Sequence, residues 1–272
     1  MSAVRAGDFL HNPQVRRQAL EEYRAAGYFI LEDVFDEASV AHMRQTWEEI
    51  SDRRRGQRKS PHASLLMIHN TNPAIVGIVR NRTLVGCVEG FLGGKVKLIQ
   101  SQLMHAGPGS GGFSPHQDNY YNRADPRDGI IAAWIAVDDV DQSNGALSVI
   151  AGSHLNGLAK TRRDWLYLLS RSPDIAKSLL RLALPKRGKQ ENDTGVIERF
   201  TYAEVPKDSM PIAAVMKAGS VLFMHGDTIH FSGPNHTNDR LRRSLLTNFV
   251  RTGTAFAKGR LSARVSFDVY AQ

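Results

Sequence analysis

The residues of this chain best suited to chemistry form an H-x-D triplet, His116-Gln117-Asp118. Side chains two residues apart on a strand point to the same face, so an extended triplet would place an imidazole beside a carboxylate. These two groups fill only part of the coordination sphere of a metal ion. A second histidine would complete a 2-His-1-carboxylate site, which suits non-haem Fe(II) and leaves positions open for other ligands. The triplet therefore predicts an iron site if a distal histidine joins it.

Two downstream histidines, His225 and His230, are candidates for the missing ligand. They lie five residues apart, so a continuous strand would point them to opposite faces. Because the chain has ten histidines, an H-x-D triplet can also arise by chance and lie on the surface. The choice between these interpretations depends on the surrounding sequence.

The elements that must position the triplet are predominantly strands. A Gly/Pro/Ser-rich loop at 106–115 precedes it, and the nearly unbroken apolar run at 130–137 is typical of a buried strand. Further strands are predicted at 28–31, 96–104, 146–150, 197–205, 211–216, 220–225, 240–250 and 263–269. Helices are predicted at 13–26, after Asp36, after Asn72, at 82–91 and, in two pieces, at 162–184. This pattern predicts a mainly β fold with flanking helices, either a barrel or a double-sheet jelly roll.

Length and composition favour a single domain. The chain has 272 residues, of which 42% are hydrophobic and 23% are charged, so it can bury one large β-rich core. We expect a helical N-terminal support at about 10–92 and a β core at about 95–154 and 197–270. The remaining segment, at about 155–208, is expected to be a variable lid insert.

Cysteine usage and hydropathy indicate the compartment. The single cysteine, Cys87, excludes an internal disulfide and suits a reducing environment. Residues 1–17 lack the apolar centre of a secretory signal, and no apolar run approaches the roughly 18 residues of a membrane span. We therefore expect a cytoplasmic protein without a membrane partner.

The net charge of +8 is concentrated in one segment. Residues 155–190 contain nine basic and two acidic side chains and so carry +7 of this charge. A nucleic-acid-binding chain more often spreads its basic residues and interleaves them with aromatic ones. We therefore expect no nucleic-acid partner, and interpret the segment either as a solvated helical face or as a lid that attracts an anionic substrate.

Several short motifs follow one another along the chain. They are HQDNYY at 116–121, AAWIAVDD at 132–139, NGAL at 144–147, AGSH at 151–154, AGSVLFMHG at 218–226, HFSGPN at 230–235 and RRS at 242–244. In this order they resemble the phytanoyl-CoA dioxygenase family over about residues 20–250. The resemblance implies an Fe(II)- and 2-oxoglutarate-dependent oxygenase on a double-stranded β-helix, a jelly-roll or cupin-like fold.

The resemblance also implies which side chains hold the iron. By this comparison His116, Asp118 and His230 are the ligands, and His230 is favoured over His225. Two neutral imidazoles and one carboxylate would leave three positions on the metal, two for a chelating 2-oxo acid and one for O2.

The other end of 2-oxoglutarate requires a buried cation. The resemblance implies the pair Arg242 and Ser244, although the spacing from the distal histidine leaves Arg243 as an alternative. A guanidinium suits this task because it binds a carboxylate through two parallel hydrogen bonds. Trp134 either lines the cosubstrate pocket or is a core residue, and Gln102 either contacts 2-oxoglutarate or does not.

The implied reaction hydroxylates an unactivated carbon and releases succinate and CO2. Asp118 favours hydroxylation, or a related oxidation such as desaturation, over halogenation, for which relatives replace the carboxylate by a small residue. The expected substrate is small and anionic: a phosphonate, a carboxylate or acylated amino acid, or an acyl-CoA. The alternative is a non-catalytic metal- or ligand-binding β-barrel of the same fold. A monomer and a homodimer are both compatible with the sequence.

Overall fold

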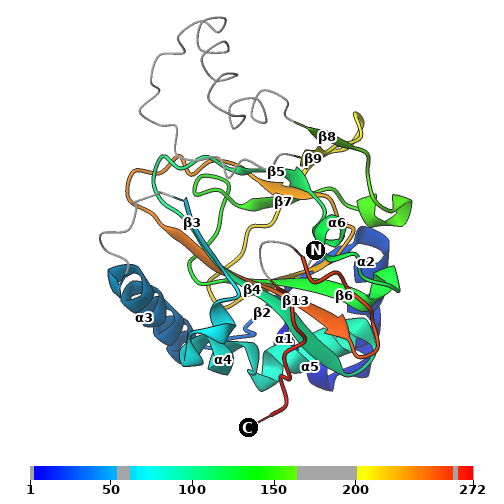
Figure 1. Ribbon diagram of the computed structural model, residues 1–272, viewed down its shortest axis with the longest axis horizontal. Helices are drawn as coiled ribbons and strands as arrows, with labels where there is room; N and C mark the ends of the chain where they lie inside the picture. The colour runs from blue at the N-terminus through cyan, green and yellow to red at the C-terminus, as the bar shows by residue number, and fades with distance from the viewer. Residues whose placement is uncertain (1–2, 54–61, 164–200, 260–262, 272) are drawn as a thin grey trace, which may run out of the picture.

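Two β-sheets face each other, and a layer of helices covers the outer face of the larger one (Figure 1). The computed structural model describes the chain except for residues 1–2, 54–61, 164–200, 260–262 and 272. The major sheet contains, in spatial order, β1 (Val4–Arg5), β2 (Tyr28–Glu32), β11 (Val221–His225), β6 (Ile130–Ala136), β13 (Arg242–Arg251), β4 (Val96–Ala106) and β3 (His62–Leu66). The minor sheet contains β10 (Ile212–Ala213), β7 (Leu147–Val149), β12 (His230–Ser232) and β5 (Phe113–His116).

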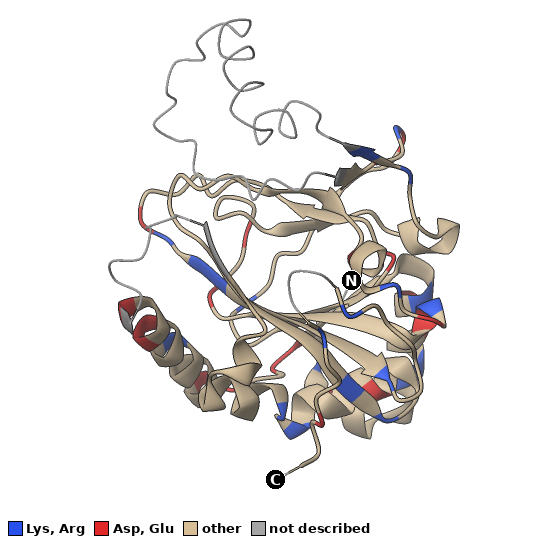
Figure 2. Cartoon of the chain, viewed as in Figure 1, with Lys and Arg blue, Asp and Glu red and all other residues tan. Residues whose placement is uncertain are grey.

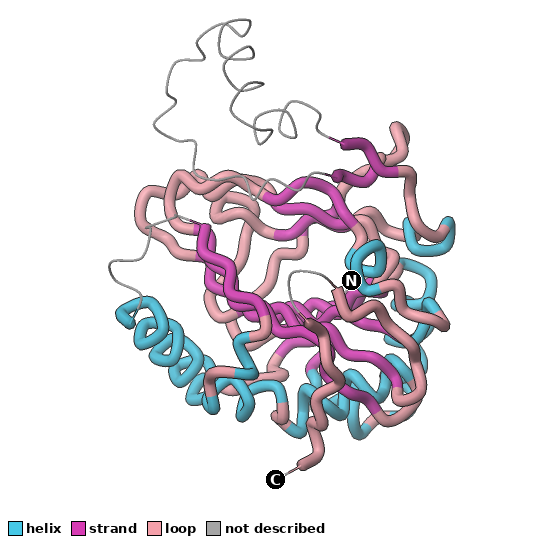
Figure 3. The backbone as a smooth tube through the Cα atoms, viewed as in Figure 1, coloured by secondary structure: helices cyan, strands magenta, loops and turns pink. Residues whose placement is uncertain are grey.

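The outer layer consists of helices that lie along one side of the major sheet (Figure 3). They are α1 (Ala6–His11), α2 (Pro13–Ala26), α3 (Glu37–Arg53), α4 (Pro73–Val79) and α5 (Arg82–Leu92). Their apolar residues and the outward residues of the major sheet form one buried cluster, in which Phe91 contacts the rings of Phe9 and Phe223. Burial of each such side chain contributes about 1.5–3 kcal/mol, so this layer anchors the sheet that carries half of the site described below.

The ends of α2 show how local sequence sets the elements. The Asn12 side chain accepts a hydrogen bond from the Gln14 backbone N–H at 3.0 Å, and Pro13 is the first helical residue, as predicted. Gly27 ends the helix with φ of 80°. A Cβ at this position would lie 2.3 Å from Nδ1 of His154, so both the backbone conformation and the close approach require glycine.

The face of the major sheet turned toward the minor sheet is partly polar. The register places Trp134, Leu246 and Gln102 in one row across β6, β13 and β4. Trp134 and Leu246 belong to an apolar cluster that includes minor-sheet residues, which identifies this as the inner face. Ser244 and Arg242 lie two and four residues before Leu246 on β13, and so share its face. All four residues considered for 2-oxoglutarate therefore lie on the inner face.

Several regions differ from the sequence prediction. The first third is not only helical support, because its residues 62–66 form the edge strand β3, paired with β4. The short strand β12 was not predicted, and 263–269 contains only an isolated bridge between Phe267 and Leu98 instead of a strand. Residues 162–163 lie in β8 (Thr161–Arg163), which pairs with β9 (Thr201–Ala203), rather than in a helix. The remainder of the helices predicted up to residue 184 lies outside the described residues.

The predicted fold class is confirmed: a mainly β chain with flanking helices and the two facing sheets of a jelly roll. Of the two architectures considered, the sheets form the jelly roll and not a closed barrel. Within the described ranges, no helix is both long enough and apolar enough to cross a membrane. The division into support, core and lid stays a prediction.

Candidate functional site

Three buried side chains, His116, Asp118 and His230, meet on the inner side of the minor sheet. The Nε2 atoms of His116 and His230 lie 3.8 and 3.9 Å from Oδ1 of Asp118, and the two imidazole centroids are 4.1 Å apart. One ligand atom from each residue lies within 4.8 Å of the others. Oδ2 of Asp118 has no hydrogen-bond partner in the described part of the chain. Three converging ligand atoms at this spacing can hold a metal ion.

Backbone carbonyls fix the orientation of both imidazoles and the nitrogen from which each one donates. Nδ1 of His116 lies 2.8 Å from the carbonyl oxygen of Ser114, and Nδ1 of His230 lies 3.0 Å from that of Thr228. A carbonyl oxygen can only accept, so each Nδ1 must carry the proton and donate it. Each Nε2 then keeps its lone pair for a metal, in the orientation that such hydrogen bonds typically impose on ligating histidines.

The triplet is not a continuous strand, contrary to the prediction from its sequence pattern. β5 ends at His116, and Asp118 begins the short helix α6 (Asp118–Asn122). Gln117 between them is still extended, with φ of −124° and ψ of 128°. The alternation of side chains therefore continues for one residue beyond the strand, and the two ligand candidates share a side.

The two distal histidines are separated by a change of sheet rather than by strand alternation. β11 ends at His225 in the major sheet, and β12 begins at His230 in the minor sheet. The ring of His225 lies 5.1 Å from that of His154, and its Nδ1 accepts a hydrogen bond from the backbone N–H of Asp227 at 3.0 Å. Burial lowers the pKa of His225. The structure thus brings His230, and not His225, to the H-x-D triplet.

Gln117 ties together the two segments that carry these ligands. Its side-chain amide donates to the carbonyl oxygens of Asp227 at 2.6 Å and Gly157 at 2.8 Å, and its oxygen accepts from the backbone N–H of Ala159 at 2.7 Å. The buried carboxylate of Asp227 in turn accepts from the Asn119 side chain at 3.0 Å. These bonds connect the start of α6 with the turn that precedes His230, so they set the spacing of the ligand atoms.

An ion pair completes this connection and gives a first prediction. Arg127 contacts Asp227 at 2.5 Å, with side chains 49% and 2% exposed. Arg127→Ala would leave the buried carboxylate with only its neutral donor, so we expect a loss of about 2 kcal/mol in the free energy of unfolding. Denaturant titration measures this change. The control is Arg162→Ala, which removes an ion pair of similar length, 2.6 Å to Glu204, at an exposed position and should change stability little. Equal losses in the two variants would contradict this account.

Arg242 is a fully buried cation on the inner face of the major sheet. It is 0% exposed, and none of its three guanidinium nitrogens has a hydrogen-bond partner among the described residues. Its Cζ lies 5.5 Å from the ring centroid of Trp134. The Nε1 of Trp134 and the Oγ of Ser244 are also buried without a partner in the described chain. Burial lowers the pKa of Arg242 to about 10, and the group still remains charged near neutral pH. These three residues carry buried donors without a described partner on the inner face of the major sheet, and an anion would satisfy them.

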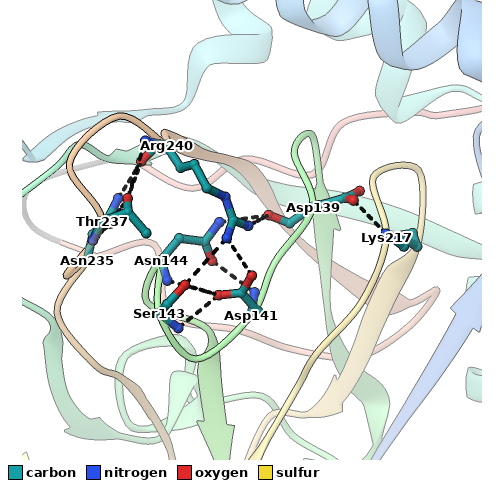
Figure 4. A network of polar contacts seen from close by, with 8 residues as sticks. All are labelled: Asp139, Asp141, Ser143, Asn144, Lys217, Asn235, Thr237 and Arg240. Atoms are coloured by element: carbon teal, nitrogen blue, oxygen red, sulfur yellow. Dashed lines mark hydrogen bonds and ion pairs between the residues drawn. The ribbon is translucent and has the colours of Figure 1, made fainter.

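The neighbouring arginines are already bound to carboxylates. Arg243 donates to Asp138 from Nε at 2.9 Å and from Nη2 at 2.8 Å, which raises the pKa of its guanidinium. Arg240 contacts Asp141 at 2.6 Å within the polar network of Figure 4. Of the three, only Arg242 is placed to receive an anion from the interior.

Sequence reasoning missed one further buried cation, Arg264. It is 8% exposed, and its Nε donates to Oε1 of Gln100 at 2.9 Å. Gln100 lies on β4 two residues before Gln102, so both glutamines are on the inner face. No motif marks Arg264, because its position follows from how the C-terminal segment folds back over the sheets.

The sequence matches a known protein family over most of its length. The family model for phytanoyl-CoA dioxygenase (PhyH) matches residues 23–244. The phytanoyl-CoA dioxygenase domain-containing protein 1 of Danio rerio is 25% identical over 240 residues, which cover 85% of this chain and 69% of that protein. A probable alpha-ketoglutarate-dependent hypophosphite dioxygenase of Stutzerimonas stutzeri is 26% identical over 249 residues, which cover 84% of this chain and 76% of that protein.

A solved structure shows the same fold. The non-heme alpha ketoglutarate dependent carbocyclase SnoK from nogalamycin biosynthesis superimposes with a TM-score of 0.67 at 18% identity, covering 98% of this chain and 97% of that one. The match of the family model to most of the sequence shows the relationship directly. The chain belongs to the phytanoyl-CoA dioxygenase family of iron- and 2-oxoglutarate-dependent oxygenases.

Proposed function

We propose that this protein hydroxylates an unactivated carbon of a small anionic molecule, consuming 2-oxoglutarate and O2 and releasing succinate and CO2. One observation carries the proposal: a buried His-Asp-His set and a buried arginine without a described partner face the same interior. Bound iron would supply the oxidising chemistry with O2 as the oxidant and 2-oxoglutarate as the co-reductant, whereas the protein supplies binding, orientation and exclusion of water.

In this proposal, His116, Asp118 and His230 hold Fe(II). Their donor set fits that ion, because each imidazole donates from Nδ1 to a backbone carbonyl and so presents Nε2 to the metal, and one carboxylate oxygen lies beside both Nε2 atoms. The set leaves the metal with a net positive charge, which favours a dianionic cosubstrate. Its buried position also strengthens this attraction, since charges interact more strongly away from water.

Arg242 would bind the distal carboxylate of 2-oxoglutarate, with Ser244 and the Trp134 N–H as further donors. The fit rests on three neighbouring buried donor groups that lack a partner in the described chain. Leaving such groups unpaired is costly, and a carboxylate would satisfy them together. Gln102 lies in the same row as Trp134 and is proposed as a lateral polar contact to the cosubstrate.

The proposed anionic character of the substrate depends on charge in the chain and on one relative. Most of the basic 155–190 segment lies outside the described residues, and of its described members Arg162 is paired with Glu204. Over the helical layer, basic and acidic positions are interspersed (Figure 2). Support comes from the related hypophosphite dioxygenase, whose named substrate is an anion. A cytoplasmic location, the absence of a nucleic-acid partner, and a monomeric or homodimeric state remain proposals.

The test uses the colour of the bound chelate. We expect Fe(II)-loaded protein to develop a visible metal-to-ligand charge-transfer band when 2-oxoglutarate is added without oxygen. Absorbance is recorded during the titration, and iron content is measured separately. The band reports chelation at the metal directly, before any substrate is known.

The outcomes separate the possible functions. A band, together with succinate formation stimulated by some member of a substrate panel, supports the proposal. Bound iron without a band would favour the alternative of a non-catalytic metal-binding protein of the same fold. Failure to bind iron would refute the proposed site.

A further inference from the structure

Arg264 occupies a position between the major sheet and the helix that carries Asp118. Besides its bond to Gln100 on the inner face, its Nη1 lies 3.4 Å from the carbonyl oxygens of Tyr121 and Ala257. Tyr121 belongs to α6, whose first residue is Asp118. The charge of Asp118 is close enough to oppose the lowering of the Arg264 pKa by burial. The guanidinium therefore lies beside the interior that holds the proposed iron ligands.

Arg264 lacks the anion that a buried arginine normally contacts. Arg242 and Arg264 are the two buried arginines of the described chain. The three hydrogen bonds of Arg264 all go to neutral oxygens, and its Nη2 makes none with the described residues. By contrast, the partly exposed Arg127, Arg240 and Arg243 each contact a carboxylate. Burial of an uncompensated charge is unfavourable, so an anion from outside the chain is expected at this position.

2-Oxoglutarate does not supply the anion expected beside Arg264, because its charge is already balanced by the other groups of the proposed site. A ferrous ion, the Asp118 carboxylate, a dianionic 2-oxoglutarate and the Arg242 guanidinium sum to neutrality. The charge of Arg264 then remains uncompensated in a region of low dielectric constant. A neutral substrate would leave this imbalance, whereas an anionic one would remove it.

Two other buried atoms indicate what accompanies the anion. Oδ1 of Asn122 and Oδ1 of Asn248 have no hydrogen-bond partner among the described residues. Asn248 pairs with Gln100 in the sheet register, and Asn122 follows Tyr121 in α6, so both flank the contacts of Arg264. Acceptors without a donor suit a ligand that carries N–H or O–H groups near its charge.

We propose that Arg264 binds the oxyanion of the primary substrate, a carboxylate or phosphonate with a neighbouring N–H or O–H donor, while Arg242 binds 2-oxoglutarate. The inference rests on the proposed function and specifies its substrate class. A guanidinium can hold either oxyanion through paired hydrogen bonds, which would orient the rest of the molecule in the interior between the sheets.

Calorimetric titration of matched acid and amide probes tests this assignment. Protein loaded with Mn(II) and saturating 2-oxoglutarate is titrated with N-acetylleucine and its amide, octanoate and octanamide, and hexylphosphonate. We expect at least one acid to bind about 10- to 100-fold more tightly than its amide or, for the phosphonate, than octanamide. Arg264→Gln should reduce this ratio of acid affinity to amide affinity to near one. Arg264→Lys keeps the positive charge but not the paired N–H donors of a guanidinium, and should give an intermediate value.

Controls distinguish this inference from the proposed function and from a structural role. Arg251→Gln removes the same charge at a half-buried position that contacts Asp128 at 3.7 Å and should leave the acid-to-amide ratio unchanged.

The Fe(II)–2-oxoglutarate band should persist in Arg264→Gln. Absence of that band in the wild type refutes the proposed function itself. A normal band with no preference for any acid, or with a preference that survives in Arg264→Gln, overturns the role of Arg264 alone. If Arg264→Gln does not fold, the acid-to-amide affinity ratio is compared between wild type and Arg264→Lys. A lower ratio in Arg264→Lys supports the role of Arg264, and an equal ratio overturns it.

Discussion

His230→Ala is expected to lower Fe(II) affinity by more than about 100-fold and to reduce 2-oxoglutarate turnover to background. Loss of a residue that only orients a metal ligand typically costs 10- to 100-fold in affinity, and loss of the ligand itself should cost more. Nε2 of His116 and Oδ1 of Asp118, which lie 3.8 Å apart, would remain and could still bind a metal weakly. Equilibrium dialysis against Fe(II) without oxygen, followed by a succinate assay, measures both effects.

His225→Ala is the matched control for this prediction. His225 lies five residues before His230 in the sequence, but it ends a strand of the other sheet and its ring contacts that of His154. We expect its replacement to leave Fe(II) affinity within about two-fold of the wild type, because it removes no ligand. If His225→Ala abolished metal binding while His230→Ala did not, the proposed ligand set would be wrong.

Arg242→Gln is expected to weaken 2-oxoglutarate binding by about 30- to 1000-fold with little effect on Fe(II) affinity. Removing one partner of a buried, hydrogen-bonded charge pair typically costs about 2–5 kcal/mol, and a 30- to 1000-fold loss of affinity corresponds to about 2–4 kcal/mol. Arg242 is fully buried, and its guanidinium has no hydrogen-bond partner among the described residues, so most of the lost hydrogen bonding belongs to the cosubstrate. Titration of the charge-transfer band gives the dissociation constant.

Arg243→Gln provides the comparison for Arg242. It removes a guanidinium from the next residue of the same strand, but this guanidinium points to the opposite face and binds Asp138 at 2.8 Å. We expect a lower free energy of unfolding, because the carboxylate of Asp138 loses its ion pair, and an unchanged affinity for 2-oxoglutarate. A larger loss of 2-oxoglutarate affinity in Arg243→Gln than in Arg242→Gln would transfer the cosubstrate role to Arg243.

The parts of the fold that the sequence predicts well are those determined by local chemistry. Asn12 and Pro13 start a helix and Gly27 ends it because caps depend on a few adjacent residues. The apolar run at 130–137 is a central strand because all of β6 is buried. By contrast, β12 has three residues and exists through its pairing with β5 and β7, which no local pattern records.

The candidate site likewise contains residues that the sequence predicts and residues that only the three-dimensional structure identifies. Residue types and motif order point to His116, Asp118 and His230, but the sequence alone leaves Arg242 and Arg243 open. The choice between these two arginines depends on the register of β13, which the pairing of Ser244 with Ala136 defines. Arg264 could not be found from a motif, because its significance lies in what surrounds it in three dimensions.

The division of the site between the two sheets has a mechanical consequence. The imidazoles belong to short strands of the minor sheet, whereas Arg242 belongs to a ten-residue strand of the major sheet. A cosubstrate bound as proposed would connect the metal on one layer with the guanidinium on the other. It would then act as a removable crosslink, formed when 2-oxoglutarate enters and broken when succinate leaves. Each catalytic cycle would tighten and then loosen the contact between the layers, and product release would coincide with the looser state.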